Sequence, residues 1–361
     1  MHPRLAGLAD NTAIELGDFM CTSPGAGDGT CERVTDYSGF TYDSTHHQFL
    51  MFGGGHATTM TDSVFAFDLT SSLAWRELYP PTPCSAMTHG NLDSANGAWL
   101  AGPAGPYPRP LSIHSYDSLN WAPAQGELLL LSRMFTGGYC NPLGNDIGGP
   151  IAHYSVTNNA WTFSMADALS SSDIDATEFD PVSGKVIIFG RAGLSTYDPA
   201  TRTRTVIVDT FNGETLKTTT GADFDFGPVS YGNTMVYFPP SDTFFYFVRG
   251  APVAVYALKL NRANLRMSTA ELVATSGPTS DHSEPGYAYD SRNQIIGGGV
   301  QQNLFYAFDP ATRTWTAHTI MGGAPGSVAF LALGYDPASN VFVFVTDYSD
   351  GARTWAYRFK N

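Results

Sequence analysis

The stretch YAYDSRNQIIGGGVQQNLFYAFDP, residues 287–310, determines the expected fold. It reads as an aromatic strand, a turn of Asp, Ser and Asn, an apolar strand that ends in glycines, and a second aromatic strand. The segment TWTAHTI (314–320) then provides a fourth strand. Short strands joined by tight turns predict a four-stranded antiparallel unit.

The same pattern occurs six times along the chain. The second strands of the six copies are QFLMFGG (48–54), ELLLLSR (127–133), KVIIFGR (185–191), TFFYFVR (243–249), QIIGGG (294–299) and VFVFVTD (341–347). An aromatic first strand and a turn precede each, for example HSYDSL (114–119) in the second copy. The copies span about 37–80, 112–165, 176–208, 233–272, 285–320 and 332–361. Repetition of one small unit predicts a repeat architecture.

The sixth copy runs out of chain before its fourth strand. The segment NTAIELG (11–17) resembles a fourth strand and is expected to complete that sheet. Pairing both chain ends in one sheet removes the last open edge of a ring. We therefore expect an all-β chain in which residues 1–361 form a single β-propeller of six four-stranded blades. Residues 208–232 hold no clear repeat, so a seventh blade stays open.

The repeats also resemble a known family. A GG pair after the second strand, a YD or FDP turn, and a following Trp are similar to the kelch-type repeat, as in the propeller of galactose oxidase-like proteins. Only the copies at 37–80 and 285–320 carry all of these features together. The resemblance implies a propeller fold, and a fold of this kind serves many functions.

Composition and charge exclude several classes of protein. The 361 residues carry 19 Lys and Arg against 33 Asp and Glu, a net charge of −14, and 43% of them are hydrophobic. Such a chain can build a large core, and its charge repels nucleic acid. No apolar run approaches the roughly 20 residues of a membrane span. We expect a monomer of secreted or periplasmic origin whose signal peptide is not part of this sequence.

Four cysteines support that origin without proving it. An even and sparse set fits disulfides in an oxidising compartment, and four buried reduced thiols are the alternative. Cys84 and Cys140 fall in long connections of neighbouring copies, so a bond between them is plausible. Cys21 and Cys31 would then form the second pair.

Long connections are expected on one face of the ring, which we call the loop face. The residues that end the second strands are aligned there, and three consecutive copies carry Arg133, Arg191 and Arg249. A guanidinium group matches a carboxylate, sulfate or phosphate. The alternative is that these arginines pair with acidic residues of adjacent blades. Further binding candidates near this face are Arg109, His282, Glu284 and Asp347.

Proton-transfer groups are expected on the same face. His56, His114 and Tyr139 fall in or beside its long connections, and histidine titrates near neutral pH. With the arginines they suggest β-elimination on an acidic, uronate-containing polysaccharide. An arginine would neutralise the uronate carboxylate, a base would remove the neighbouring proton, and an acid would protonate the departing oxygen. The residue types are similar to those of propeller-fold polysaccharide lyases.

Two other functions stay open. One is a non-catalytic, lectin-like module that binds carbohydrate or protein on the same face. The other is a glycoside hydrolase with paired carboxylates, for which Asp62, Glu284 and Asp347 are candidates. Serine-hydrolase, zincin and nucleotide-binding motifs are absent from the sequence. No cofactor is expected, and bound Ca²⁺ or Zn²⁺ stays open.

Overall fold

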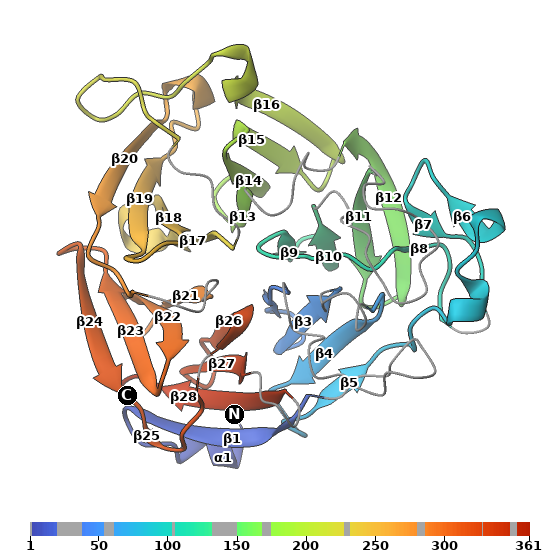
Figure 1. The fold of residues 1–361 in the computed structure, drawn as a ribbon, viewed down its shortest axis with the longest axis horizontal. Helices are drawn as coiled ribbons and strands as arrows, with labels where there is room; N and C mark the ends of the chain where they lie inside the picture. Colours follow the sequence, from blue (N-terminus) through green and yellow to red (C-terminus); the bar gives the residue numbers. More distant parts are fainter. Residues whose placement is uncertain are drawn as a thin grey trace.

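Six sheets of four or five strands lie around a common centre in the computed structural model (Figure 1). The structure describes residues 2–19, 38–53, 61–102, 105–131, 150–167, 175–226, 232–279, 286–326, 328–346 and 352–361. Within these ranges the regular secondary structure is mainly β strand, and the first strand of each sheet lies nearest the centre (Figure 1). The arrangement is consistent with a β-propeller-like fold.

Five of the sheets are four-stranded antiparallel meanders in chain order. The first has β2 (Thr41–Asp43), β3 (Gln48–Phe52), β4 (Val64–Asp68) and β5 (Trp75–Glu77), and the second has β9 (Leu119–Ala122), β10 (Glu127–Leu130), β11 (Pro150–Ser155) and β12 (Ala160–Asp167). The third has β13 (Asp175–Asp180), β14 (Lys185–Gly190), β15 (Gly193–Asp198) and β16 (Thr203–Asp209). The fourth has β17 (Thr234–Phe238), β18 (Thr243–Val248), β19 (Ala254–Lys259) and β20 (Thr269–Ala274), and the fifth has β21 (Tyr287–Asp290), β22 (Ile295–Gln301), β23 (Leu304–Asp309) and β24 (Thr314–Thr319).

The sixth sheet joins the two ends of the chain. It contains β26 (Val328–Asp336), β27 (Val341–Thr346) and β28 (Arg353–Arg358), and β1 (Thr12–Asp18) pairs antiparallel with β28. The predicted closure by residues 11–17 is therefore confirmed. Short β25 (Met321–Gly322) adds a parallel fifth strand beside β1. The guanidinium group of Arg358 donates to the carbonyl oxygens of Leu5 and Ala6 at the C-terminal end of α1 (Pro3–Ala6) and to that of Leu8 beyond it, which fixes this helix against the closing sheet.

One predicted strand is wrong. The segment HSYDSL (114–119) was expected to be the first strand of the second copy, but this strand is β9, which begins at Leu119. Tyr116 has φ 40°, and the N–H of Ser118 donates to the carbonyl of Ser115, so the chain turns there. The Tyr116-Asp117 pair imitates the turns of the other copies, and the true hairpin turn is at 123–126.

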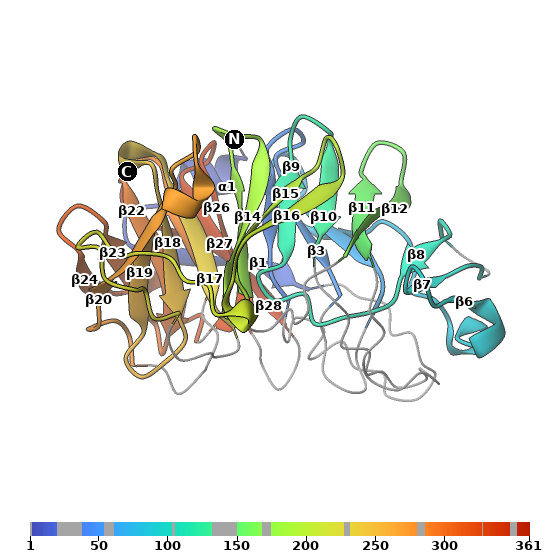
Figure 2. The same cartoon turned by 90° about the horizontal axis from the view of Figure 1, so that it is seen from above.

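The two long connections differ from one another. Residues 80–112 contain η1 (Cys84–Ala86), η2 (His89–Asn91) and a small peripheral sheet of β6 (Leu92–Asp93), β7 (Ala98–Trp99) and β8 (Arg109–Pro110) (Figures 1 and 2). The described part of 208–232 forms η3 (Thr210–Asn212), and Leu216 and Phe224 join the core beside the third and fourth sheets. That part holds no additional sheet. Two further short helices are η4 (Pro239–Ser241), which follows β17, and η5 (Leu265–Met267), which precedes β20.

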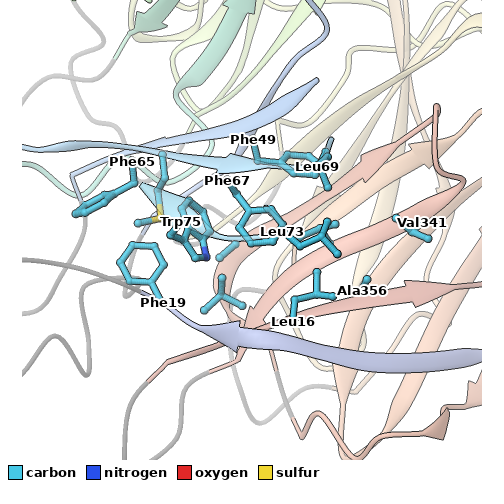
Figure 3. Packing of buried hydrophobic residues seen from close by; sticks show 14 of the residues in the cluster. Leu16, Phe19, Phe49, Phe65, Phe67, Leu69, Leu73, Trp75, Val341 and Ala356 are labelled. Carbon is cyan, nitrogen blue, oxygen red and sulfur yellow. The ribbon is translucent and has the colours of Figure 1, made fainter. Parts of the chain in front are cut away.

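Aromatic side chains fill the space between neighbouring sheets. Figure 3 shows the cluster between the first and closing sheets, where Phe19, Phe65 and Trp75 lie together and Leu16 lies beside Ala356. The Trp75 and Phe19 rings are 4.6 Å apart, and the Trp75 indole N–H donates to Thr354 Oγ1 at 2.6 Å. Close packing of this kind holds adjacent sheets in fixed positions. None of the described helices is long and apolar enough to cross a membrane.

Candidate functional site: a cavity at the centre of the ring

A cavity of about 370 Å³ lies among the first strands of the six sheets. Three successive positions of every first strand contribute to its wall. From β2 to β26 these positions are 40–42, 119–121, 177–179, 235–237, 287–289 and 333–335. Because the same positions recur in all six sheets, the repeat itself builds the cavity.

The last of the three positions is aromatic in every sheet, and we call this set the aromatic belt. It consists of Tyr42, Trp121, Phe179, Tyr237, Tyr289 and Tyr335. In each sheet the belt residue pairs with the second residue of the following strand. The belt therefore marks one level along the cavity, near the turns that connect first and second strands, where Pro123, Pro181 and Pro239 also line it.

The position before the belt divides the cavity wall into two halves. The first three sheets place Thr41, Asn120 and Glu178 there, whereas the next three place Val236, Ala288 and Gly334. One side of the wall is thus polar and the other is apolar or small. A wall of this kind suits a ligand with hydrogen-bonding groups on one side and a non-polar face on the other.

Two carboxyl groups of the cavity bind the inner edge of β17. Asp117 Oδ2 accepts the N–H groups of Met235 at 2.9 Å and Thr177 at 3.1 Å. Glu178 Oε1 accepts the N–H of Tyr237 at 3.1 Å. Since N–H groups along a strand point alternately to its two sides, those of Met235 and Tyr237 lie on the side of β17 away from β18. The two acids cap an edge that faces the cavity.

The electrostatic environment of these acids is unusual. Burial raises the pKa of Glu178 to about 7. Burial also raises the pKa of Asp117, and the nearby charge of Glu178 adds to that effect. No Lys, Arg or His is among the described residues that line the cavity. A buried negative charge that lacks a cationic partner is costly, which favours the protonated acids.

The belt tyrosines are neutral and fixed by residues of neighbouring turns. Tyr42 donates its hydroxyl to Asp336 Oδ1 at 2.8 Å, and Tyr237 donates to Asp242 Oδ1 at 2.9 Å. Burial raises the pKa of both hydroxyl groups. Their rings are therefore held in place as flat apolar walls, and they supply no negative charge of their own.

Most predicted site residues lie outside the described ranges. These are His56, Arg133, Tyr139, Cys140, His282, Glu284 and Asp347, together with Cys21 and Cys31. Cys84 is disulfide-bonded, and because every other cysteine is outside the described ranges, its pairing with Cys140 stays a prediction.

Four of the residues predicted for β-elimination and anion binding can be located, and none lines the cavity. Arg191 is exposed in the turn between β14 and β15, and its carbonyl accepts from the Thr210 hydroxyl. Arg249 directly follows β18, and its N–H donates to Asn233 Oδ1 at 3.2 Å. His114 is buried, with its ring edge-on to that of Tyr116 at 5.8 Å.

Arg109, the fourth, is fully buried in the connection between the first two sheets. Its Nε lies 3.3 Å from Asp62 Oδ2, and its guanidinium carbon lies 4.8 Å from the ring centre of Tyr79 and 4.6 Å from that of Tyr107. The carbonyl of Pro80 accepts another of its hydrogen bonds at 2.8 Å. Arg109 and Asp62 thus hold the connection in place, and each has a structural partner.

Sequence reasoning missed Asp117 and Glu178. Asp117 lies in HSYDSL (114–119) and Glu178 in TEFDPVSG (177–184), and each segment by itself predicts only a first strand with its turn. The available signal was Glu178 itself, because charged residues are rare in a first strand that is otherwise buried. Within the described residues, no cluster of three or more His, Cys, Asp or Glu could hold a metal ion.

Comparisons with known proteins identify a similar fold and no family. No protein-family model and no curated protein matches the chain. Among solved structures it is similar to an auxiliary nutrient binding protein from Bacteroides ovatus ATCC 8483, with a TM-score of 0.51 and 12% sequence identity. The match covers 90% of this chain and 69% of the other. At that identity the likeness concerns the fold alone.

Proposed function

We propose that this protein binds a sugar-type ligand in the central cavity and does not convert it chemically. The observation that carries the proposal is the division of the cavity wall into a polar and an apolar half. This division is made by the residues one strand position before the aromatic belt. Sugars present hydroxyl groups at their edges and C–H groups on their faces. Carboxyl, amide and hydroxyl groups would bind the edges, and the aromatic rings would pack against a face.

The fold and place of action are part of the same proposal. We infer that the ring is a six-bladed propeller of kelch type, because six sheets repeat one pattern and line one cavity with equivalent positions. The protein is proposed to act outside the cytoplasm, as the disulfide at Cys84 favours. The similar structure is that of a nutrient binding protein, which agrees with a binding role.

The β-elimination hypothesis has less support than binding. It requires cationic groups beside the substrate carboxylate. The described wall of the cavity supplies acids instead, and Arg191 and Arg249 are not part of it. A β-elimination reaction would still be detected by ultraviolet absorbance of unsaturated uronate products during incubation with uronate polymers. We expect no such increase in absorbance.

Calorimetric titration with a panel of mono- and oligosaccharides tests the binding proposal. Ala288 lines the apolar half of the cavity, so Ala288→Trp should fill it and abolish sugar binding. Ala317 is exposed on β24 outside the cavity, so Ala317→Trp is the matched control and should bind as the unmodified protein does. Equal binding by both variants would place the ligand elsewhere. Failure of every sugar to bind would refute the proposal.

A further inference from the structure

The two acids of the cavity are spaced along a single strand. They accept N–H groups of Met235 and Tyr237, two residues apart on β17. Two residues of an extended strand span roughly 7 Å, which is the spacing of the two N–H groups, so the two carboxyl groups that bind them are neighbours along this edge. A small positively charged group between them could therefore be approached by both carboxyl groups.

Each acid has an oxygen left for a ligand. Within the described residues, both hydrogen bonds of the Asp117 carboxyl group go to Oδ2, and that of the Glu178 carboxyl group goes to Oε1. Asp117 Oδ1 and Glu178 Oε2 have no partner in that part of the chain. Each of these two oxygens has about two lone pairs, so both can accept hydrogen bonds from a ligand.

A second group of the cavity is also unpartnered. Thr234 precedes Met235 on β17, lines the cavity, and is only 5% exposed. Its hydroxyl has no hydrogen-bond partner among the described residues. A buried hydroxyl without a partner is costly, so a polar ligand that reaches it would recover that cost.

We propose that the ligand carries an ammonium group that binds between Asp117 and Glu178; this rests on the proposed function, which supplies the sugar part of the ligand. Charge balance is the main reason. The described wall has two acids and no Lys, Arg or His, so the acids are protonated without a cationic partner, and a bound cation would let them ionise as paired charges. An ammonium ion provides three N–H donors and the missing positive charge.

The aromatic belt favours the same type of ligand. Phe179 directly follows Glu178, and Tyr237 provides the N–H that Glu178 binds. Both residues belong to the belt, so a cation held by Glu178 would lie one strand position from the level of the aromatic belt, whose rings attract positive charge. The surrounding tyrosines keep their protons because burial raises their pKa, and they do not compete for the cation as bases.

A metal ion is a less suitable occupant. Calcium takes about six to eight oxygen ligands, several of them carboxylates. Asp117 and Glu178 are the only two acids among the described residues of the wall, and both already bind backbone N–H groups. An ammonium group needs fewer acceptors than calcium does. Calcium chloride is nevertheless a useful arm of the test.

The test compares amino sugars with their neutral parents by calorimetric titration of the full chain at neutral pH. Glucosamine and galactosamine should bind about tenfold more tightly than glucose and galactose, as expected for hydrogen bonds to a charged group. In Glu178→Gln this ratio should fall towards one, because the amide keeps the acceptor for Tyr237 and loses the charge. Glu271→Gln, outside the cavity, should keep the ratio.

Salt provides a measurement that needs no variant. Raising the ionic strength should reduce the ratio of amino-sugar to neutral-sugar affinity, because it weakens attraction between charges. If Glu178→Gln does not fold, this dependence and the ratio in Asp117→Asn decide the question.

The possible outcomes separate the two proposals. Equal or weaker binding of amino sugars would overturn the ammonium proposal and leave sugar binding intact. Binding of methylammonium, with no binding of any sugar, would overturn the proposed function and keep the charge preference. Tighter binding of calcium chloride than of amino sugars would also overturn the ammonium proposal. Absence of all binding would overturn both.

Discussion

Asp117 and Glu178 belong to neighbouring sheets, yet both bind the same strand of a third sheet. Asp117 lies just before β9 and Glu178 lies within β13, and their partners on β17 are two residues apart. The relationship joins three successive sheets at the centre of the ring. It also means that one pair of side chains serves both the fold and the candidate site.

Loss of the Asp117 carboxyl should destabilise the protein. Asp117→Ala leaves two N–H groups, those of Thr177 and Met235, without their acceptor. We expect a loss of about 2–6 kcal/mol in the free energy of unfolding, because each of the two unsatisfied groups costs about 1–3 kcal/mol. Urea denaturation followed by circular dichroism measures this loss.

The controls for Asp117 are one conservative and one distant variant. Asp117→Asn keeps an oxygen acceptor and should lose less than about 1.5 kcal/mol. Asp223 is 68% exposed and pairs with Lys217, so Asp223→Ala should change stability by less than about 1 kcal/mol. A loss in Asp117→Ala no larger than that in Asp223→Ala would contradict the capping role.

Glu178 should make stability depend on pH. Its pKa is raised to about 7 in the folded protein from an ordinary value of 4.5. The folded state therefore holds the proton more tightly than the unfolded chain, and this contribution is complete below the lower pKa. It should be lost as pH rises towards about 7, by up to about 3 kcal/mol, since one pKa unit equals about 1.4 kcal/mol.

The variant Glu178→Gln isolates that contribution. Between about pH 4 and about pH 8, the unmodified protein should lose stability relative to Glu178→Gln. The measured quantity is the difference between their free energies of unfolding at each pH. The raised pKa of Asp117 makes stability fall with pH in the same direction, but Asp117 is present in both proteins and does not enter the difference. A difference that stays constant over this range would show that burial does not perturb Glu178.

Arg109 should prove structural. Arg109→Ala leaves Asp62 buried without its cationic partner, which costs about 3–5 kcal/mol in comparable pairs. Burial already raises the pKa of Asp62, against the effect of Arg109. Arg266 is 61% exposed and pairs with Glu214, so Arg266→Ala should lose less than about 1 kcal/mol. The urea midpoints of unfolding of Arg109→Ala and Arg266→Ala measure both losses of stability. Equal losses in the two variants would refute a structural role of Arg109.

Arg191 distinguishes the cavity from the loop face. Its side chain is exposed, so Arg191→Ala should change the free energy of unfolding by less than about 0.5 kcal/mol. It should also leave sugar binding in the cavity unchanged. A selective loss of affinity for uronate oligosaccharides, measured by the same titration, would instead support the anion-binding surface expected from the sequence.

Much of the fold could be predicted from local patterns. Strands such as VFVFV (341–345) and TFFYFV (243–248) are short, aromatic or β-branched, and bounded by turn residues, so the sequence determines them locally. The pairing of β1 with β28 could also be predicted, because an incomplete repeat at one end matched a strand at the other.

The errors came from residues whose conformation depends on the surrounding structure. Tyr116-Asp117 has the composition of the repeated turn, yet the chain reverses direction before the strand and frees Asp117 to reach β17. The site was missed for a similar reason. Which acid reaches which backbone N–H depends on three sheets meeting at the centre, and no local pattern in a single copy records that contact.

The most direct test is a crystal structure of the protein with a bound amino sugar. The account predicts the sugar ring beside the aromatic belt, with its amine between Asp117 Oδ1 and Glu178 Oε2. A sugar bound instead beside Arg191 and Arg249, with the central cavity empty, would contradict it.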